Sequence, residues 1–398
     1  MSHSHHSVVV VGGGNAGLSV AGRLQRHGVK DVVVIEPREH HLYQPMFSHV
    51  AGGTARASMA TRPQASVMPK GVGWIRDAVS AIDPDSNRLT LVSGDTIGYD
   101  QVLVCTGIQK DWNRIPGLAA AMGSPSGASH YEFDLAAKAS LLLRDLQRGT
   151  VVFTQPAGPA TCAGASQKPM YLACDYWRAA GVLDDIRVVM IVPDPTVFGI
   201  PLIDEELERK VAEYGIELRC DTELVEVDAE SRVAVIAHDG VTERLPYDLL
   251  HAVPPQSAPA WLKDSALPAV GDELGFVEVD PHTLRHTRFP SVWALGDSAA
   301  TTNSKSGGAL RKQTTVVAAN VEAALRGKPA TSVYDGYTVC PFTVSRSTVV
   351  FAEFDDAYQL KPTIPFWKGL ARERRLTWVF DRHILPWVYW HMILKGRA

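Results

Sequence analysis

The chain has 398 residues, of which 45% are apolar and 21% are charged, and its formal net charge is −4. This composition is ordinary for a globular protein of two or three domains, and it argues against a disordered chain or a nucleic-acid-binding module. The five cysteines form no CxxC pair, and no His/Cys group has zinc-finger spacing. We therefore expect neither a secreted disulfide scaffold nor a metal site.

The first predicted unit is a strand, a glycine-rich turn, a helix and a second strand. The apolar run Val8–Val11 predicts a buried strand, residues 17–26 a helix, and Val32–Ile35 the second strand. Between strand and helix, Gly12, Gly14 and Gly17 have the spacing that permits a tight turn and close approach to a pyrophosphate at the helix start. Glu36, which ends the second strand, can accept hydrogen bonds from ribose hydroxyls. The unit therefore predicts a dinucleotide site.

Two later strands carry companion motifs of this site. The strand Gln101–Cys105 ends in Thr106-Gly107, and the strand at 291–295 ends in Gly296 and Asp297. Both motifs are typical of flavoproteins with two dinucleotide folds, in which such an aspartate holds the ribityl chain of FAD. The three motifs in this order predict FAD rather than NAD at the first site.

The middle of the chain predicts a second α/β unit inserted into the first. Strands are expected near 150–154, 187–192 and 216–219, and a helix over 166–179. We therefore predict an α/β fold with two Rossmann-like domains, followed by a C-terminal region of amphipathic helices. The expected boundaries are 1–116 and 267–330 for the FAD-binding domain, 117–266 for the second Rossmann-like domain, and 331–398 for the C-terminal region.

A cysteine loop stands where the second unit would carry its own glycine motif. Residues 155–164 contain two prolines and only two glycines, which makes a poor nucleotide cradle. Cys162 lies just before a helix, where backbone amides and the helix dipole would stabilise a thiolate. Cys340 lies in an irregular loop next to Pro341. From spacing alone, a redox-active pair and two unrelated thiols both remain open. The other three thiols, Cys105, Cys174 and Cys220, are predicted to be packing residues.

The C-terminal segment is both basic and aromatic. Residues 361–398 carry a net charge of +6, against −10 for the rest of the chain, which favours an anionic surface as partner. The longest uncharged run, Ile384–Leu394, is shorter than the roughly 20 residues that span a bilayer, and Pro386 is expected to break or kink the helix. We favour an interfacial membrane anchor, which would place a quinone within reach. Packing on the protein's own core or on a second subunit remains the alternative.

Several short motifs along the chain are more specific than the glycine-rich turn. They are His41-Leu42-Tyr43-Gln44-Pro45, residues 71–74, Ala163-Gly164-Ala165 with Gln167-Lys168, Met170-Tyr171-Leu172, His251 before Pro254-Pro255, Gly296-Asp297, Asn303-Ser304-Lys305-Ser306, residues 334–337 with Cys340-Pro341, and Pro386-Trp387-Val388-Tyr389-Trp390. With these motifs the chain resembles the sulfide:quinone oxidoreductase family, specifically the branch that includes the mitochondrial enzymes. The resemblance implies that Cys162 and Cys340 form a redox-active disulfide. It also implies that Glu36, Gln44, Val79 and Lys305 contact FAD beside a phosphate loop at Asn15 and Ala16.

The resemblance also implies a reaction. Hydrogen sulfide would be oxidised at the disulfide to a cysteine persulfide, and a small acceptor such as sulfite, cyanide or a thiol would remove the sulfane sulfur. Two electrons would pass through FAD to a membrane quinone. Residues 307–313 look more polar than the family's alanine-rich helix. The start of the chain shows no signal or transit peptide, which predicts a peripheral protein on the cytoplasmic face of a bacterial inner membrane.

Three further possibilities remain open. A type II NADH:quinone dehydrogenase would share the fold, the FAD and the membrane surface. A non-turnover FAD/thiol redox sensor would use the C-terminal region to dock a protein. The chain could also form a homo-oligomer.

Overall fold

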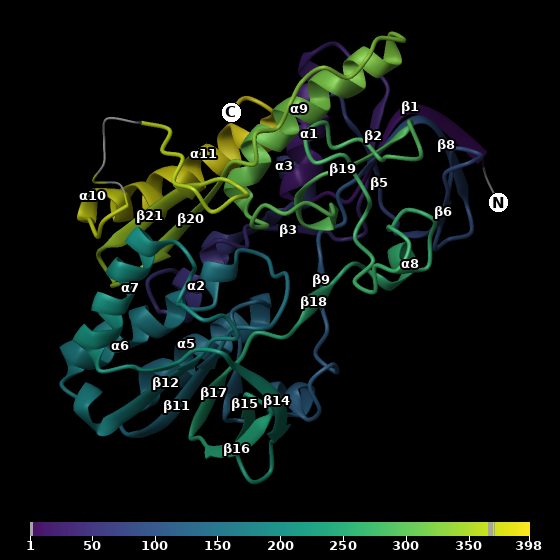
Figure 1. The fold of residues 1–398 in the computed structure, drawn as a ribbon. Coiled ribbons are helices and arrows are strands. Elements are labelled where there is room, and N and C mark those ends of the chain that lie inside the picture. Colours follow the sequence, from purple (N-terminus) through teal and green to yellow (C-terminus); the bar gives the residue numbers. More distant parts are fainter. Residues whose placement is uncertain (1–2, 365–368, 370) are drawn as a thin grey trace.

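The computed structural model describes residues 3–364, 369 and 371–398, and its two largest sheets lie one above the other in Figure 1. The first sheet has a parallel core in the order β5-β2-β1-β8, with β19 also paired to β8 and the antiparallel strands β7 and β6 beyond. Its strands are β1 (His3–Val11), β2 (Val32–Ile35), β5 (Gly73–Ile75), β6 (Val79–Asp83), β7 (Arg88–Leu91), β8 (Thr96–Val104) and β19 (Val292–Ala294).

Strand β1 begins earlier than its apolar run. His3 pairs with Thr96 and His6 with Tyr99 of β8, so the histidine-rich start is an exposed extension of the strand. The valines that follow are buried and pair with β2 and β8 on either side. Helices α1 (Asn15–Arg26) and α9 (Gly307–Leu325) pack together beside this sheet.

The second sheet is parallel throughout, in the order β10-β17-β11-β12-β13. Alternate residues of β11 belong to different cores: Val151 and Phe153 pack with helices α5 to α7, and Val152 packs with α4 and a three-stranded antiparallel sheet. The elements are β10 (Gly127–Ala128), β11 (Gly149–Thr154), β12 (Ile186–Ile191), β13 (Glu217–Arg219), β17 (Leu249–His251), the antiparallel β14 (Thr222–Asp228), β15 (Val233–His238) and β16 (Val241–Pro246), and the helices α4 (Leu118–Gly123), α5 (Phe133–Asp145), α6 (Lys168–Ala180) and α7 (Pro201–Tyr214).

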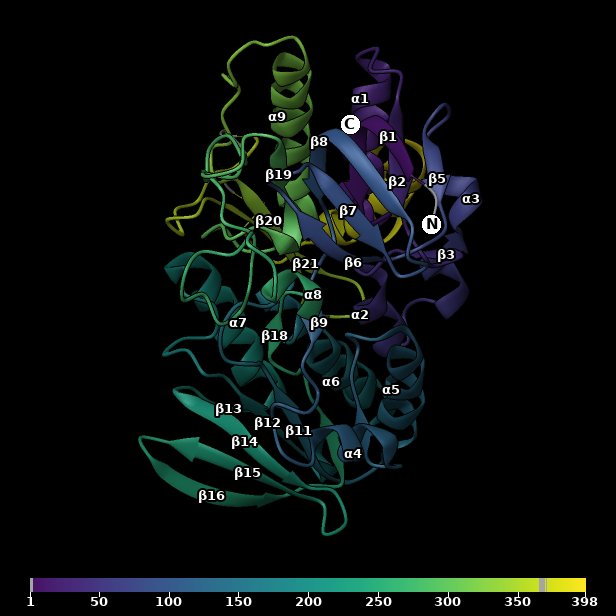
Figure 2. The same ribbon diagram turned by 90° about the vertical axis from the view of Figure 1, so that its right-hand side faces the viewer.

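Short paired segments join the two parts of the molecule. Strands β9 (Gln109–Lys110) and β18 (Gln256–Ser257) pair where the chain leaves the first sheet and returns to it, as Figure 2 shows. The remaining short elements are β3 (His40–Leu42), β4 (Thr61–Pro63), α2 (Met46–Ala51), α3 (Gln64–Val67) and α8 (Ala260–Lys263).

The C-terminal region is a hairpin followed by a helical segment. Strands β20 (Thr338–Thr343) and β21 (Val349–Phe354) form the hairpin, and α10 (Arg375–Val379) runs through a π-helical turn at Phe380–Ile384 into α11 (Leu385–His391). Pro386 does not break this helix as expected. It lies in the first turn of α11, directly after the π-helical turn, where its missing N–H and its ring are tolerated.

The helical segment has a buried face and an exposed apolar face. Tyr389, Trp390 and Leu394 belong to the core of the first sheet. The alternative prediction, that the segment packs on the protein's own core, is therefore confirmed for this face. The opposite face exposes Leu376 (59%), Val379, Phe380, Ile384 and Trp387 (57%) to solvent. Across the described parts of the chain, no helix combines the length and the apolar character that crossing a bilayer requires.

Candidate active site

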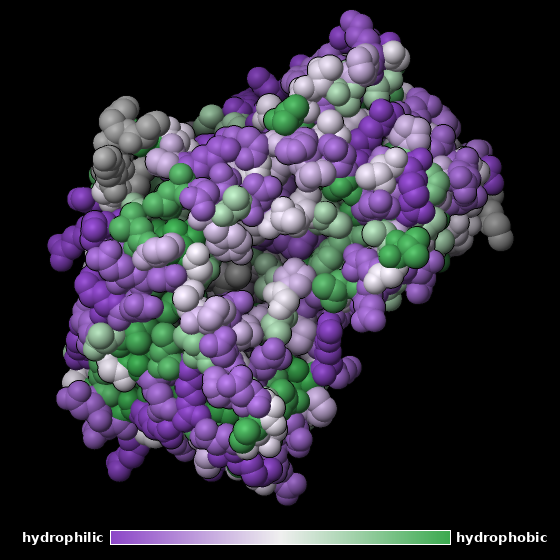
Figure 3. Space-filling model, viewed as in Figure 1, coloured by the Kyte–Doolittle hydropathy of each residue, from purple (hydrophilic) through white to green (hydrophobic). Residues whose placement is uncertain are grey.

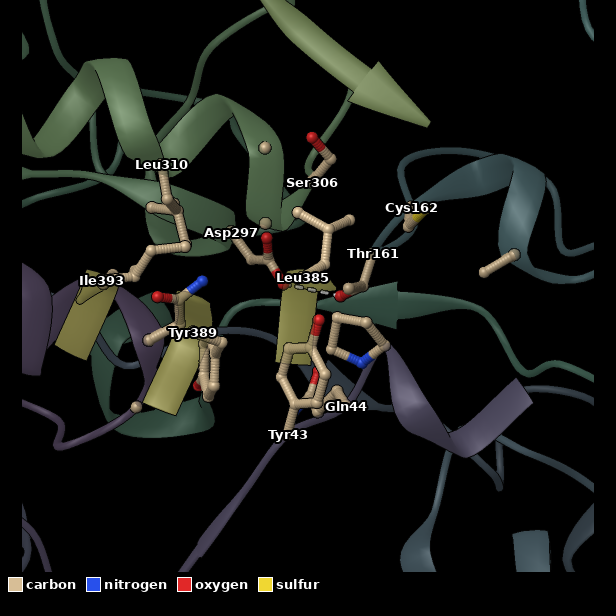
Figure 4. A pocket seen from close by; sticks show the side chains of 18 of the residues that line it. Tyr43, Gln44, Thr161, Cys162, Asp297, Ser306, Leu310, Leu385, Tyr389 and Ile393 are labelled. Atoms are coloured by element: carbon tan, nitrogen blue, oxygen red, sulfur yellow. Dashed lines mark hydrogen bonds between the residues drawn. The ribbon is translucent and has the colours of Figure 1, made fainter. Parts of the chain in front are cut away.

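A cavity of about 690 Å³ lies between the two sheets and the C-terminal helices. The face of the molecule in Figure 3 is hollowed where the upper and lower parts meet. In Figure 4, Tyr43 and Gln44 line the cavity on one side, and Leu385 and Tyr389 reach it from α11. Its size is that of a typical cofactor or ligand pocket.

The glycine-rich loop forms one end of this cavity around the start of α1. Gly12 has a φ of +105°, and a Cβ there would stand 2.4 Å from the carbonyl oxygen of Cys105, so only glycine fits. A Cβ on Gly14 would meet no atom within 4 Å, so the loop is open towards the cavity. The Glu36 carboxylate accepts a 2.8 Å hydrogen bond from the Gly13 amide, which fixes the loop.

Three features of this end fit a bound FAD. Helix α1 has no side-chain cap and no charged residue in its first turn that would compete for a phosphate, so its free amides and dipole suit an anion. The Thr106 hydroxyl is buried and, within the described residues, has no hydrogen-bond partner. The Asp297 carboxylate lines the cavity and accepts a 2.6 Å hydrogen bond from the Thr161 hydroxyl, drawn in Figure 4. Burial raises the pKa of Asp297. A buried carboxyl group of this kind gains from hydrogen bonds, and the hydroxyl groups of a ribityl chain could supply them.

The structure places most of the predicted site residues around the cavity, but four lie outside its lining. Gly17 packs under the loop, Val79 pairs with Leu91 in β6, and Cys340 lies behind Cys162. The Lys305 ammonium donates to the Ala299 carbonyl at 2.7 Å and is not part of the cavity lining. The predicted residues that line the cavity are Gly12, Gly14, Asn15, Ala16, Glu36, Gln44, Thr106, Gly107, Cys162 and Asp297.

The two candidate thiols lie together, with 3.4 Å between the Sγ atoms of Cys162 and Cys340. This distance is a sulfur–sulfur contact, longer than the roughly 2.05 Å of a disulfide bond. Cys162 holds a left-handed φ of +48°, and its amide donates to the Lys305 carbonyl at 2.5 Å. A Cβ on Gly164 would stand 2.8 Å from the Cys340 sulfur, so glycine allows the loop to approach that thiol.

The two thiols are electrostatically unequal. The hydrogen bond between the two thiols lowers the pKa of Cys162 to about 6 despite burial. The Lys168 ammonium lowers the pKa of Cys162 further, whereas the same hydrogen bond and burial hold the pKa of Cys340 well above its ordinary value. Cys162 is therefore the thiol of the pair that ionises more readily.

Lys168 is the cation of this part of the cavity. It is the first residue of α6 and is 94% buried, and none of the described carboxylates forms an ion pair with it. A buried cation at a helix N-terminus opposes the helix dipole, so it requires a nearby negative charge. Burial lowers the pKa of Lys168, but the charges of the cysteine pair and of Asp381 outweigh that effect and raise it. The sulfur pair is thus the largest source of the counter-charge.

Sequence reasoning missed several histidine contacts at the cavity. His41 lies within hydrogen-bond distance of the Gly13 carbonyl (3.1 Å) and the Tyr389 hydroxyl (2.6 Å), which joins the glycine-rich loop to α11. The buried His130 ring lies 3.2 Å from the His251 ring, and His49 pairs with Asp381. These partners are far apart in the chain, so no local pattern could have revealed them.

Comparison with known proteins agrees with this arrangement. The family model for pyridine nucleotide-disulphide oxidoreductases matches residues 6–323. Mitochondrial sulfide:quinone oxidoreductase of Mus musculus is 34% identical over 99% of this chain and 87% of its own length. The Dictyostelium discoideum enzyme of the same name is 33% identical over 98% and 86%. The crystal structure of sulfide:quinone oxidoreductase from Aquifex aeolicus superposes with a TM-score of 0.83 at 19% identity, covering 99% of this chain and 92% of that one.

The matches to the two mitochondrial enzymes extend over nearly the whole chain. The predicted irregular loop around Cys340 is wrong, because Cys340 lies in β20 and is paired with Ala352 of β21. The predicted resemblance, the α/β fold with a Rossmann-type FAD-binding unit and the FAD cofactor are confirmed. This chain belongs to the pyridine nucleotide-disulphide oxidoreductase family and, within it, to the FAD-dependent sulfide:quinone oxidoreductases.

Proposed function

We propose that this protein oxidises sulfide and passes the two electrons to a quinone at a membrane surface. The observation that carries the proposal is the thiol pair, 3.4 Å apart, at the edge of a cavity that fits FAD. The loop that holds Cys162 occupies the place of a second nucleotide cradle. The sulfur pair therefore supplies the electrons that a nicotinamide would supply in a reductase.

The chemistry begins on the oxidised pair. Hydrosulfide attacks Cys340 of the Cys162–Cys340 disulfide, so the old S–S bond breaks, a persulfide forms on Cys340, and Cys162 leaves as a thiolate. A thiol of low pKa is the better leaving group, and the Lys168 ammonium and the Ala165 backbone amide both lower the pKa of Cys162. The Cys162 thiolate remains next to the Lys168 ammonium, and both residues line the cavity. Its negative charge is therefore held where the flavin would bind.

The pair then returns to its starting state. A small nucleophile, which we propose to be sulfite, cyanide or a thiol, removes the sulfane sulfur from Cys340 and leaves a thiolate there. Closing the two thiolates to a disulfide releases two electrons. Bound FAD supplies the two-electron redox chemistry that links the thiols to the quinone.

The other end of the cavity suits an apolar acceptor. Leu376, Phe380 and Ile384 line it and are also exposed on the outer face of the C-terminal helices. A quinone dissolved in a membrane could pass between these side chains without crossing water. We propose that this face lies in the membrane interface, with the basic residues of the segment at the lipid headgroups.

The test of the proposed activity is anaerobic mixing of the FAD-loaded protein with sulfide, with a parallel sample mixed with NADH. Sulfide should bleach the flavin absorbance or produce a long-wavelength band, and a soluble quinone should then restore the oxidised spectrum. Bleaching by NADH alone would assign the chain to the NADH dehydrogenases. A protein that responds to neither would be a sensor.

The membrane part of the proposal is tested with vesicles that contain anionic lipid. Trp387→Glu places a charge on the exposed apolar face and should weaken vesicle binding about ten-fold or more. Val241→Glu is the matched control, because Val241 is also exposed (71%) but lies on β16, far from the C-terminal helices. Equal binding by the two variants in co-sedimentation would contradict the interfacial placement.

A further inference from the structure

A buried histidine–carboxylate pair lies at the quinone end of the cavity. The His49 ring nitrogen Nε2 is 3.0 Å from the Asp381 carboxylate, and the two side chains are only 4% and 14% exposed. His49 belongs to α2 and Asp381 to the π-helical turn before α11. The pair therefore joins two elements that are distant in the chain and meet only at this cavity.

Both nitrogens of the His49 ring have a polar partner. The Thr54 hydroxyl donates to the His49 carbonyl at 3.2 Å, and its oxygen lies 2.9 Å from His49 Nδ1. On the other side of the ring, Nε2 faces the Asp381 carboxylate. An imidazole with a polar partner on each nitrogen can take a proton at one nitrogen and release one at the other.

The surroundings make this pair unusual. Asp381 lines the cavity among Leu376, Phe380 and Ile384, where an acidic side chain is costly unless it has a partner or a task. On its other side, Thr54 is half-buried next to the exposed Gly53, so Asp381, His49 and Thr54 lead from the cavity towards solvent. The other charged or titratable groups close to this chain of residues are Arg382 on the Thr54 carbonyl, Arg346 on the Gly52 carbonyl, and Lys168, Tyr43 and Cys340, which feel the charge of Asp381.

We propose that Asp381 and His49 deliver protons to the quinone during its reduction. This inference rests on the proposed function. A proton passes from His49 to the Asp381 carboxylate and from there to a quinone oxygen, and solvent reprotonates His49 through Thr54. The route delivers one proton each time it runs and runs twice for each quinone, so the pair is unchanged after a turnover.

The proton balance of the reaction requires such a route. Conversion of a quinone to a quinol takes two electrons and two protons, and the electrons are those released by sulfide. The protons of hydrogen sulfide are released at the thiol pair, in another part of the cavity. The side chains Leu376, Phe380 and Ile384 at the quinone end are exposed on the face proposed to lie in the membrane interface, where lipid would replace water. Protons would then reach the quinone along protein groups.

The experiment compares two acceptors at fixed pH, with sulfide and sulfite as co-substrates. Decylubiquinone takes up protons on reduction, whereas ferricyanide takes up electrons only. In Asp381→Asn, decylubiquinone reduction should fall about a hundred-fold and show a larger solvent deuterium isotope effect, whereas ferricyanide reduction, which needs no proton at the acceptor, should fall far less. Asp381→Glu should restore part of the quinone rate.

The control is Glu322→Gln, which removes the carboxylate of a similar histidine pair, His27–Glu322 at 2.9 Å, outside the cavity. Quinone rates that are unchanged in Asp381→Asn, or equal losses with both acceptors, would overturn the proton route. If Asp381→Asn does not retain FAD, the rates of decylubiquinone and ferricyanide reduction are compared in His49→Gln instead. A wild-type protein that cannot reduce quinone with sulfide would instead overturn the proposed function.

Discussion

The loops after β1 and after β11 each connect a parallel strand of one sheet to a helix, yet the two loops present different groups to the cavity. After β1, the three residues 12–14 lead directly into α1, which starts without a charged residue in its first turn. After β11, the thirteen residues 155–167 lead into α6, whose first residue is the buried Lys168. The first loop offers free amides to a phosphate, and the second holds a thiolate.

The difference shows that strand–loop–helix topology does not specify the ligand. The dipole of each helix favours a negative charge at its start. In the first loop, glycines keep the space for that charge empty, so an external phosphate can enter. In the second, Cys162 and Gly164 bring sulfur into the space, so the anion belongs to the chain itself.

Serine substitutions of the two paired cysteines should have the largest effect on turnover. Cys162→Ser and Cys340→Ser should each lower sulfide-dependent quinone reduction by at least about a thousand-fold, because neither can form the disulfide. FAD content should remain at the wild-type level, since the first loop is unchanged. Cys220→Ser is the control, as Cys220 does not line the cavity. Wild-type turnover in either catalytic variant would exclude the disulfide mechanism.

An alanine at position 14 should show whether the open space beside the first loop holds the FAD pyrophosphate. Gly14→Ala adds a Cβ that meets no protein atom within 4 Å, so the melting temperature of the apoprotein should not change. Where FAD binds, the same methyl would crowd the pyrophosphate and cost about 2 kcal/mol, or about thirty-fold in Kd. Titration of the apoprotein with FAD, followed by flavin fluorescence, measures this. An unchanged Kd would mean that the phosphate lies elsewhere.

Removal of the buried Lys168 cation should raise the pKa of the Cys162 thiol rather than abolish its reactivity. In Lys168→Met, the thiolate of Cys162 loses its counter-charge, so the thiol pKa should rise by about one unit from its value near 6. The pH dependence of alkylation of the reduced protein, read by mass spectrometry, reports this pKa without turnover. Lys312→Met serves as the control, because Lys312 pairs with Asp335 on the surface. Identical profiles for the two variants would assign Lys168 a packing role.

Local sequence patterns predicted the repeated elements of the fold well. The strand Val32–Ile35 is placed as expected, and the strands at 149–154 and 186–191 differ by one residue at their ends. Valine runs and glycine spacing are local patterns, so they can be recognised without knowledge of the fold. The domain boundaries at 117, 267 and 331 remain predictions.

Long-range pairings limited what the sequence could reveal. Cys162 and Cys340 are 178 positions apart, and spacing alone left their pairing open. The pair His49–Asp381 depends on how α2 packs against the C-terminal helices, which no pattern encodes. The extension of β1 through His3–His6 was missed for a similar reason, because backbone pairing with β8 outweighs the polar character of the histidines.

The contacts of His41 have a consequence for how the protein is made. His41 bridges the glycine-rich loop to Tyr389, which follows it by 348 positions. During synthesis the first sheet can fold long before the residue that closes the FAD cavity leaves the ribosome. We therefore expect stable flavin binding to require α11, so that a chain interrupted before this helix retains less flavin although its glycine motif is complete.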